Sequence, residues 1–390
     1  MTLNEIKIRG LYGLYDYDLD FADIKESDVR FITAPNGFGK TTILRLIENF
    51  FNRSMTLFVS PKLVYKEVEF HMPQYTVRIT QKRTVNDDIN SDDILDKIEA
   101  TVSVYAAKGR ILIEEKTINQ QDVEQNNDNL LPSSLNVYLR TRRPRLVADN
   151  RLWVNEGEYE HIVRLSRKVG DLISERDEQI AKNVNRLAFV YANKRQAFND
   201  EIGKLRAGIV RLLARYHSVG LALEFNDTMI MDKDNPMSVS YLIALNETLS
   251  AKDSYLLKLE CFAKWVNQCE FANKKLILQK DNGVVFEIND GLSTKILPEE
   301  LSSGEKQMVV QAIELLFNSQ DISIVLIDEP ELSYHVAWQM VYLKNIRQVS
   351  KLSRIQYIIA THNPQMFNYD WDLSIDLYAQ SKLLHNTREQ

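Results

Sequence analysis

The sequence is poor in cysteine. Cys261 and Cys269 are the only two in 390 residues, and neither belongs to a CxxC pair. This scarcity excludes a disulfide framework and zinc sites built on paired thiols, and it is typical of a reducing compartment. The chain also has no run of 18 uncharged apolar residues, and its first residues, from Met1 to Ile8, contain no apolar signal core. We therefore expect a cytoplasmic protein without a membrane span.

A strong charge of one sign and internal repetition are missing as well. The formal net charge is −6, with 26% charged and 44% hydrophobic residues, which is an ordinary globular composition. Any nucleic-acid surface must therefore be local. No repeat with a period of about 20–50 residues is evident, which argues against a solenoid. At about 150 residues per domain, the length allows two or three domains.

The most informative segment is the sequence APNGFGKTT at residues 34–42. It lies between an apolar, β-branched run at 29–33 and a run with helical spacing at 43–51. A strand, a glycine-rich loop and a helix in this order predict a phosphate-binding loop, although Ala34 stands where GxxxxGK[ST] has its first glycine. The glycines let backbone N–H groups point inward, and the start of the helix adds partial positive charge. We predict these nucleotide-binding residues: Asn36, Gly37, Phe38, Gly39, Lys40, Thr41 and Thr42.

The N-terminal part otherwise reads as β-rich. Alternating patterns predict strands at 5–9 and 15–21, and further antiparallel strands between residues 63 and 113. The segment 119–129 is rich in Gln, Asn and Asp and predicts a loop, and 135–139 is one more strand candidate.

Five arginines follow within twelve positions around Pro144. They could contact DNA phosphates or the acidic surface of a partner, or they could belong to a solvated linker paired with nearby carboxylates. No aromatic side chains are interleaved to stack on bases. The cluster consists of Arg140, Arg142, Arg143, Arg145 and Arg151.

Apolar residues recur at helical spacing from about residue 159 to 275, with charges between them. This pattern predicts an α-helical insertion, a short arm with a turn near 226–236. Heptads are not sustained, so a long coiled coil is not expected. We divide the chain into residues 1–150, residues 151–274 as the helical arm, and residues 275–390.

A second motif lies at 322–331, where an apolar run ends in Asp328 and Glu329. A buried parallel strand would deliver these carboxylates to its C-terminal edge, where open α/β sheets bind ligands. We expect Asp328 to join Thr41 in holding Mg²⁺, and Glu329 to act as the general base that activates water.

Two further motifs complete the set. LSSGEKQ at 301–307 opens a helix, a pattern that any N-cap can show, but the motif lies some 24 residues before Asp328. A second buried run, 358–361, ends in His362, which we expect to sense the γ-phosphate. A lone histidine is otherwise more often structural.

Together the four motifs resemble those of the ABC-type ATPases of the SMC, RecF and OLD (overcoming-lysogenisation-defect) superfamily. The resemblance covers residues 1–60 and 275–370 and implies a P-loop head with a mixed central sheet, an antiparallel β subdomain and bound ATP and Mg²⁺. It also implies a homodimer or higher oligomer in which Ser302 and Gly304 contact the γ-phosphate held by Lys40 of another protomer. The Gln-containing loop of such heads is not placed.

The branch of the superfamily follows from spacing. A gap of 261 residues between Lys40 and Leu301 argues against transporters, and the arm is too short for a chromosome-structuring SMC protein and lacks a zinc-hook CxxC. Only 28 residues follow His362, too few for a Toprim nuclease domain. The chain looks like the standalone OLD-like "AAA family" ATPase subunits of bacterial antiphage defence systems.

We therefore expect an ATPase that senses or scaffolds and controls a separate, nuclease-like effector. The alternative is a RecF- or SMC-like ATPase that binds DNA in repair or recombination, with the arginines as its contact surface. A basic groove and DNA-stimulated turnover would favour the alternative, and a protein partner would favour the first reading.

Overall fold

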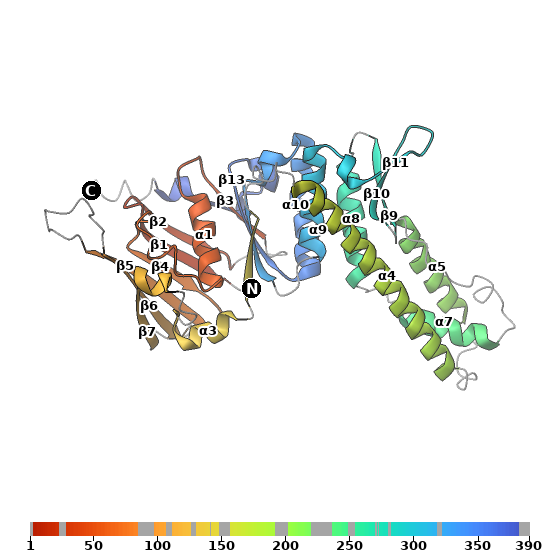
Figure 1. Ribbon diagram of the computed structural model, residues 1–390, viewed down its shortest axis with the longest axis horizontal. Coiled ribbons are helices and arrows are strands. Elements are labelled where there is room, and N and C mark those ends of the chain that lie inside the picture. Colours follow the sequence, from red (N-terminus) through yellow and green to blue (C-terminus); the bar gives the residue numbers. More distant parts are fainter. Residues whose placement is uncertain are drawn as a thin grey trace. The chain divides into compact units, whose positions relative to one another are not determined.

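The computed structural model describes residues 3–22, 29–84, 97–106, 111–125, 130–140, 142–147, 157–191, 202–219, 236–248, 254–269, 271, 273–279, 282–317 and 322–381. The chain forms two compact units, one of Met1–Asn150 with Ser319–Gln390 and one of Arg151–Asn318. Figure 1 shows the elements of both units, which are described separately below.

A five-stranded sheet of parallel strands is the centre of the first unit, in the order β14-β3-β13-β12-β8. Its strands are β3 (Val29–Thr33), β8 (Arg143–Val147), β12 (Ile322–Asp328), β13 (Gln356–Thr361) and β14 (Ser374–Asp376). β3 and β13 are buried along their whole length, as expected for strands covered on both faces. The register pairs Asp328 with Ala360 and Thr361 with Thr33, so the carboxyl ends of β12, β13 and β3 lie at one edge.

Two helices accompany this sheet. Helix α1 (Lys40–Phe51) packs against β8, β12 and β13, and α10 (Val336–Ser353) packs against β3. The apolar spacing of α1 explains its docking, because its inward face carries Ile43, Leu44, Ile47 and Phe50, all completely buried. Short 3₁₀ turns follow two of the strands: η4 (Pro330–Ser333) after β12 and η5 (Pro364–Phe367) after β13.

The six-stranded antiparallel sheet of the same unit has the order β2-β1-β4-β5-β6-β7. Its strands are β1 (Glu5–Leu11), β2 (Tyr15–Asp20), β4 (Glu67–His71), β5 (Tyr75–Thr84), β6 (Lys97–Ala106) and β7 (Leu112–Asn119). One apolar cluster joins it to α1 and to the parallel sheet, with the rings of Phe50 and Phe70 stacked at 3.9 Å between centroids. This shared core fixes the start of α1 against the parallel sheet.

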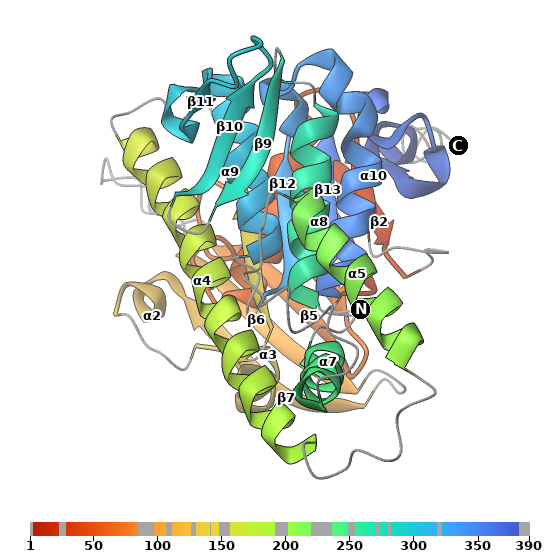
Figure 2. The same cartoon turned by 90° about the vertical axis from the view of Figure 1, so that its right-hand side faces the viewer.

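The second unit contains five helices among its described residues and one small antiparallel sheet in the order β11-β10-β9 (Figure 2). The helices are α4 (Gly157–Tyr191), α5 (Ile202–Ser218), α7 (Pro236–Thr248), α8 (Ser254–Gln268) and α9 (Ser303–Phe317). The strands are β9 (Lys274–Gln279), β10 (Gly283–Ile288) and β11 (Lys295–Ile296), followed by η3 (Pro298–Glu300).

Helix α4 docks closely on the β9–β10 hairpin. The Ser166 hydroxyl accepts from the backbone N–H of Val284 at 3.0 Å, and Gly283 has a φ of +67°. A Cβ at Gly283 would lie 1.8 Å from the Ser166 carbonyl oxygen, so both the backbone conformation and the close approach require glycine there.

The mixed α/β fold and most of the expected strands are confirmed, but the strand expected at 135–139 is wrong. Residues Ser133–Leu139 form helix α3. The Glu114 carboxylate accepts from the backbone N–H and the hydroxyl of both Ser133 and Ser134, which caps the helix start. Leu135, Tyr138 and Leu139 then share a buried face at helical spacing.

Two other local expectations need correction. The loop expected at 119–129 begins with helix α2 (Gln120–Glu124), because Asn119 and Asp122 cap each other reciprocally, and residues 126–129 lie outside the described residues. The arginine-rich segment contains strand β8, which was not expected from its charges. The turn expected near 226–236 lies outside the described residues except for Pro236, which begins α7.

The compact units also differ from the three-part division expected from the sequence. Residues 151–274 and 275–318 belong to one unit, whereas the sequence pattern grouped 275–318 with the C-terminal segment. No helix among the described residues is both long and apolar enough to span a bilayer.

Candidate functional site

The phosphate loop occupies residues 34–39, between the end of β3 and the start of α1. Gly37 and Gly39 have φ values of +91° and +86°, a region that side chains disfavour. A Cβ at Gly39 would also lie 3.0 Å from the Leu11 side chain. The helix starts without a side-chain cap and without an acidic residue in its first turn. Its first backbone N–H groups are therefore suited to an anion.

Lys40 is buried although it is charged, with 5% of its side chain exposed. Its ammonium group donates to the carbonyl oxygens of Ala34 at 2.8 Å and Pro35 at 3.3 Å. It also lies 3.0 Å from Glu329 Oε1. The lysine thus connects the phosphate loop to the end of β12. The alanine that replaces the first glycine of the motif still offers its backbone carbonyl oxygen to the Lys40 ammonium group.

Thr41 and Asp328 meet across the same edge. The Thr41 hydroxyl donates to Asp328 Oδ2 at 2.7 Å. A hydroxyl and a carboxylate are the oxygen donors that Mg²⁺ takes beside nucleotide phosphates. The donor set therefore fits the Mg²⁺ site expected from the sequence.

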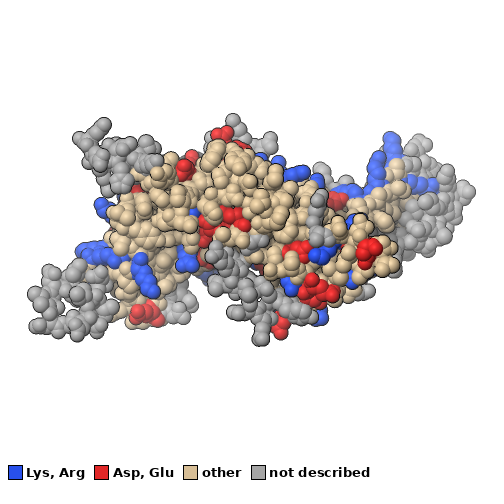
Figure 3. All heavy atoms as spheres, turned by 90° about the horizontal axis from the view of Figure 1, so that it is seen from above, with Lys and Arg blue, Asp and Glu red and all other residues tan. Residues whose placement is uncertain are grey.

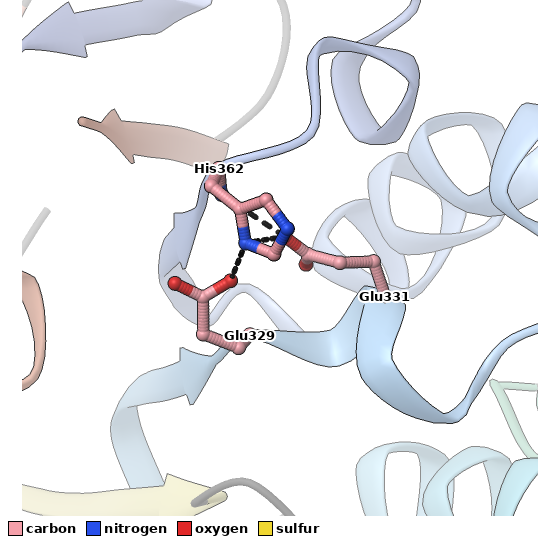
Figure 4. A group of neighbouring side chains, drawn as sticks. All are labelled: Glu329, Glu331 and His362. Atoms are coloured by element: carbon pink, nitrogen blue, oxygen red, sulfur yellow. Dashed lines mark hydrogen bonds and ion pairs between the residues drawn. The ribbon is translucent and has the colours of Figure 1, made fainter. Parts of the chain in front are cut away.

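Glu329 follows Asp328 in a left-handed backbone conformation, with a φ of +45°. This conformation is uncommon for a residue with a side chain and directs the carboxylate toward the end of β13. Glu329 Oε2 lies 2.5 Å from His362 Nδ1, as Figure 4 shows. Because β12 and β13 are parallel neighbours, the two motifs meet although 33 residues separate them.

Glu331 is a member of the site to which the sequence reasoning assigned no role. Its Oε1 atom accepts from the Thr361 hydroxyl at 2.5 Å and from the His362 backbone N–H at 2.9 Å. His362 Nδ1 lies 3.1 Å from the same oxygen. The signal available in the sequence was a third acid only three residues after Asp328, at the start of a turn.

The two neighbouring glutamates have pKa values shifted in opposite directions. Burial, and then the contact with Glu329, raises the pKa of Glu331 to about 7. Burial also acts to raise the pKa of Glu329, but hydrogen bonds with Glu331, Lys40 and His362 and the charge of Lys40 outweigh it and lower that pKa. Glu329 is thus the ionised member of the pair at neutral pH, as a general base must be.

Glu329, Glu331 and His362 also present three donor atoms within 4.8 Å of one another, a spacing that could suit a metal ion. These donors are already engaged by Lys40, the Thr361 hydroxyl and each other. The Mg²⁺ site expected from the sequence, at Thr41 and Asp328, stays a prediction.

The remaining residues of the loop are distributed around it. Asn36 is exposed at the loop tip, and the Thr42 hydroxyl lies 2.5 Å from the Tyr12 hydroxyl. Phe38 packs edge-on against Tyr378 with 5.4 Å between centroids, and its carbonyl accepts from the Tyr17 hydroxyl at 3.0 Å. These contacts fix the loop's outer side rather than adding reactive groups.

Ser302 and Gly304 belong to the second unit, at the start of α9. The Ser302 N–H and hydroxyl both donate to Glu305 Oε2, at 2.9 and 2.8 Å. Lys274 donates to both carboxylate oxygens of Glu305, at 2.9 and 3.0 Å. Burial acts to raise the pKa of Glu305, but these bonds outweigh it and lower the pKa. The serine at the start of α9 is thus held by an acid in the first turn of that helix, and a lysine pairs with the acid.

The arginine cluster is partly used by the fold itself. The Arg142 guanidinium lies over the Tyr138 ring, 3.7 Å from its centroid, and donates to the Tyr138 carbonyl at 2.7 Å. Arg145 lies in β8, where burial lowers its pKa, while Arg140 is exposed. On the face that Figure 3 shows, the described residues carry both basic and acidic groups, and neither sign forms one continuous surface. A DNA or partner contact at Arg140, Arg142, Arg143 and Arg145 stays a prediction.

A phosphate loop, a hydroxyl–carboxylate pair and a glutamate with a lowered pKa at one sheet edge are the arrangement expected of a nucleotide-hydrolysing site. The family model AAA_15, described as AAA ATPase domain, matches residues 1–367, so the chain belongs to this family and is an AAA-type ATPase. No curated protein matches the chain.

The chain is also similar to solved structures of SMC heads. One is the Smc head domain with an extended coiled coil from Pyrococcus furiosus, bound to the C-terminal domain of ScpA (13% identity, 99% of both chains, TM-score 0.36). Another is the SMC head domain from Thermotoga maritima (13% identity, 96% of this chain and 92% of that chain, TM-score 0.34). A third is an SmcHead bound to the C-winged helix domain of ScpA (11% identity, 94% and 91%, TM-score 0.35).

Proposed function

We propose that the protein is a Mg²⁺-dependent ATPase whose hydrolytic residues all lie in the first compact unit. The observation that carries this proposal is the set of contacts joining Lys40 to Glu329, Thr41 to Asp328 and Glu329 to His362. These contacts bring three separate segments of the chain to one sheet edge. They supply a phosphate-binding cation, a metal site and a base.

Each residue has a distinct role in the proposed reaction. The N–H groups of the loop and the Lys40 ammonium bind the phosphates of ATP. Thr41 and Asp328 would hold Mg²⁺, which when bound neutralises phosphate charge. Glu329 orients the attacking water and accepts its proton, and His362 holds the Glu329 carboxylate and faces the γ-phosphate.

Lys40 and Glu329 form a close pair that must separate when ATP binds. With 3.0 Å between them, each neutralises the charge of the other in a largely buried place. A bound phosphate competes for the lysine, so the glutamate becomes available to water only when phosphate takes its place. ATP binding would thus free the base.

We further propose that Ser302 and Gly304 complete the ATP site of a second copy, giving a homodimer or higher oligomer. Ser302 is exposed at the start of a 15-residue helix, where an approaching phosphate could reach its hydroxyl and the following N–H groups. In the cell, we propose that the protein is a cytoplasmic sensor or scaffold that controls a separate nuclease-like effector in antiphage defence. This proposed role is supported by the resemblance of the sequence motifs.

The activity is tested with Glu329→Gln. The variant keeps the size and a hydrogen-bonding side chain but cannot accept a proton, so we expect ATP turnover to fall about 100-fold with ATP affinity preserved. Phosphate release and equilibrium binding of ATP measure the two. Turnover at the wild-type rate would mean that the base lies elsewhere.

The same variant tests the biological role. Because it should hold ATP without hydrolysing it, we expect it to retain partners when it is purified with ATP from its native host. Recovery of a nuclease-like protein supports the effector role. Salt-sensitive duplex DNA without a protein partner would instead favour the DNA-repair alternative.

A further inference from the structure

Glu331 is a buried carboxylate that the proposed reaction does not use. Only 4% of its side chain is exposed, although burying a carboxylate is unfavourable unless it is well hydrogen-bonded. Its Oε1 atom accepts two hydrogen bonds from the segment after β13, one from the Thr361 hydroxyl and one from the His362 N–H. Figure 4 shows its carboxylate beside the His362 ring, with Glu329 beyond it.

These two bonds join the loops that carry the base and the histidine. Glu331 lies in η4, two residues after Glu329, whereas Thr361 ends β13 and His362 follows it. Without the carboxylate, the direct contacts between the two segments that remain are the Glu329–His362 pair and the backbone bond from the Glu329 N–H to the Ala360 carbonyl.

The backbone around Glu331 is itself fixed from helix α10. The buried amide of Gln339 donates to the carbonyl oxygens of Glu331 at 3.3 Å and Tyr334 at 3.0 Å. The oxygen of the same amide accepts from the Asn363 side chain at 2.6 Å. The two loops are therefore also held to each other, and to helix α10, through the Gln339 and Asn363 side chains.

We propose that Glu331 is a positioning residue for hydrolysis, whose carboxylate holds Thr361 and the His362 N–H so that the imidazole stays against Glu329. The inference deepens the proposed function and rests on it. Positioning within a few tenths of an ångström is what keeps a general base effective.

Substitutions at Glu331 can distinguish the need for a hydrogen-bond acceptor from the need for a negative charge. The two groups that donate to Glu331 Oε1 through the Thr361 side chain and the His362 backbone are an O–H and an N–H, so a neutral carbonyl oxygen at the same place can accept from them. Glutamine supplies such an oxygen at the same reach, whereas alanine supplies none. Glu331→Gln should therefore preserve the position of His362, and Glu331→Ala should not.

Turnover and ATP affinity are measured for the wild type and both variants. We expect Glu331→Ala to lower kcat about 30-fold with ATP affinity within twofold of wild type, and Glu331→Gln to stay within about threefold in both. Glu69→Ala is the matched control, since Glu69 is a largely buried carboxylate in the antiparallel sheet that pairs with Arg78, and it should leave kcat unchanged.

Thr361→Val approaches the contact from the other side and serves if Glu331→Ala does not fold. It removes one of the two donors at nearly constant volume, so we expect kcat to fall about fivefold. If Glu331 acts through Thr361, the double variant Glu331→Ala with Thr361→Val should lose no more than Glu331→Ala alone.

Amide hydrogen exchange of the peptide containing His362 gives a readout that does not need turnover. Faster exchange in Glu331→Ala than in Glu331→Gln supports the proposal. Equal exchange, a Glu331→Ala kcat within twofold of wild type, or Glu331→Gln as slow as Glu331→Ala would overturn it. A wild type that hydrolyses no ATP would instead refute the proposed function, and the exchange comparison would still decide whether Glu331 holds the loop.

Discussion

The residues that we expect to bind phosphate make different kinds of contact in the two compact units. In the first unit, the Glu329 carboxylate contacts both Lys40 and His362, so one side chain joins three segments of the chain. In the second unit, Ser302 contacts its own helix, because Glu305 takes both its N–H and its hydroxyl. One arrangement is assembled from distant parts of the sequence, and the other is a local cap.

The difference shows what each unit must give up to bind phosphate. In the proposed reaction, the first unit would exchange the Lys40–Glu329 contact for contacts to ATP, which would leave Glu329 available as the base. The second unit must release the Ser302 hydroxyl from Glu305, an acid whose charge Lys274 compensates at 2.9 Å. A phosphate approaching an uncompensated carboxylate would be repelled. Under the proposed function, the first unit would bind ATP by itself, and the second unit would contribute to the site of another copy.

Lys40→Ala breaks the first arrangement and has the largest expected effect. The variant loses the cation that holds phosphate and leaves Glu329 without its charged partner, so we expect ATP affinity to fall at least about 100-fold, close to 3 kcal/mol. Equilibrium binding of ATP measures it. Affinity near the wild-type value would remove Lys40 from the site, and Lys62→Ala, an exposed lysine outside the loop, is the control.

The first arrangement was largely predictable from sequence and the second unit's contacts were not. Apolar runs in the sequence indicate the two buried strands, one ending in Asp328 and one directly followed by His362, and parallel neighbours bring their ends together. The role of Glu331 depends on Thr361, 30 residues away, which no local pattern reports. Lys274 meets Glu305 in the same way, across a strand and a helix.

Local patterns failed where distant contacts decide the structure. The segment 135–139 has an apolar pattern too short to separate strand from helix, and the distant Glu114 caps it as helix α3. Strand β8 was hidden by arginines and by Pro144, which a sheet tolerates there because β8 is at its edge.

Ser302→Arg tests whether the second unit acts on another copy. A bulky cation at the exposed cap should block the approach of a second site, so we expect turnover to fall at least about 10-fold with ATP binding preserved. Mixing this variant with Lys40→Ala should restore about one quarter of wild-type turnover, because half of the dimers then carry one intact composite site. No recovery on mixing would place both motifs' functions within one chain.

Lys274→Met sharpens the comparison by leaving Glu305 uncompensated while Ser302 is unchanged. We expect turnover to fall about fivefold with ATP affinity near that of wild type, since the repelled phosphate belongs to the other copy. Lys274→Arg keeps the charge and should stay close to wild type. A loss of ATP affinity in Lys274→Met would show that the lysine serves the first unit's site instead.

The smallest effect concerns stability and pH. The pKa of Glu331 is raised by burial to about 7 in the folded chain from an ordinary 4.5, so the folded state binds more protons than the unfolded state between these values. The contribution of Glu331 to the free energy of unfolding should therefore be fully present below about pH 4.5. This contribution, at most about 3 kcal/mol, should be lost as pH rises through about 7. The lowered pKa of Glu329 opposes part of this change.

The variant Glu331→Gln removes the titration. In thermal unfolding, its melting temperature should therefore rise relative to that of wild type as the pH is raised from 5 to 8. A difference that stays constant over that range would mean that Glu331 is already ionised at pH 5, with Lys40 and His362 providing the compensation.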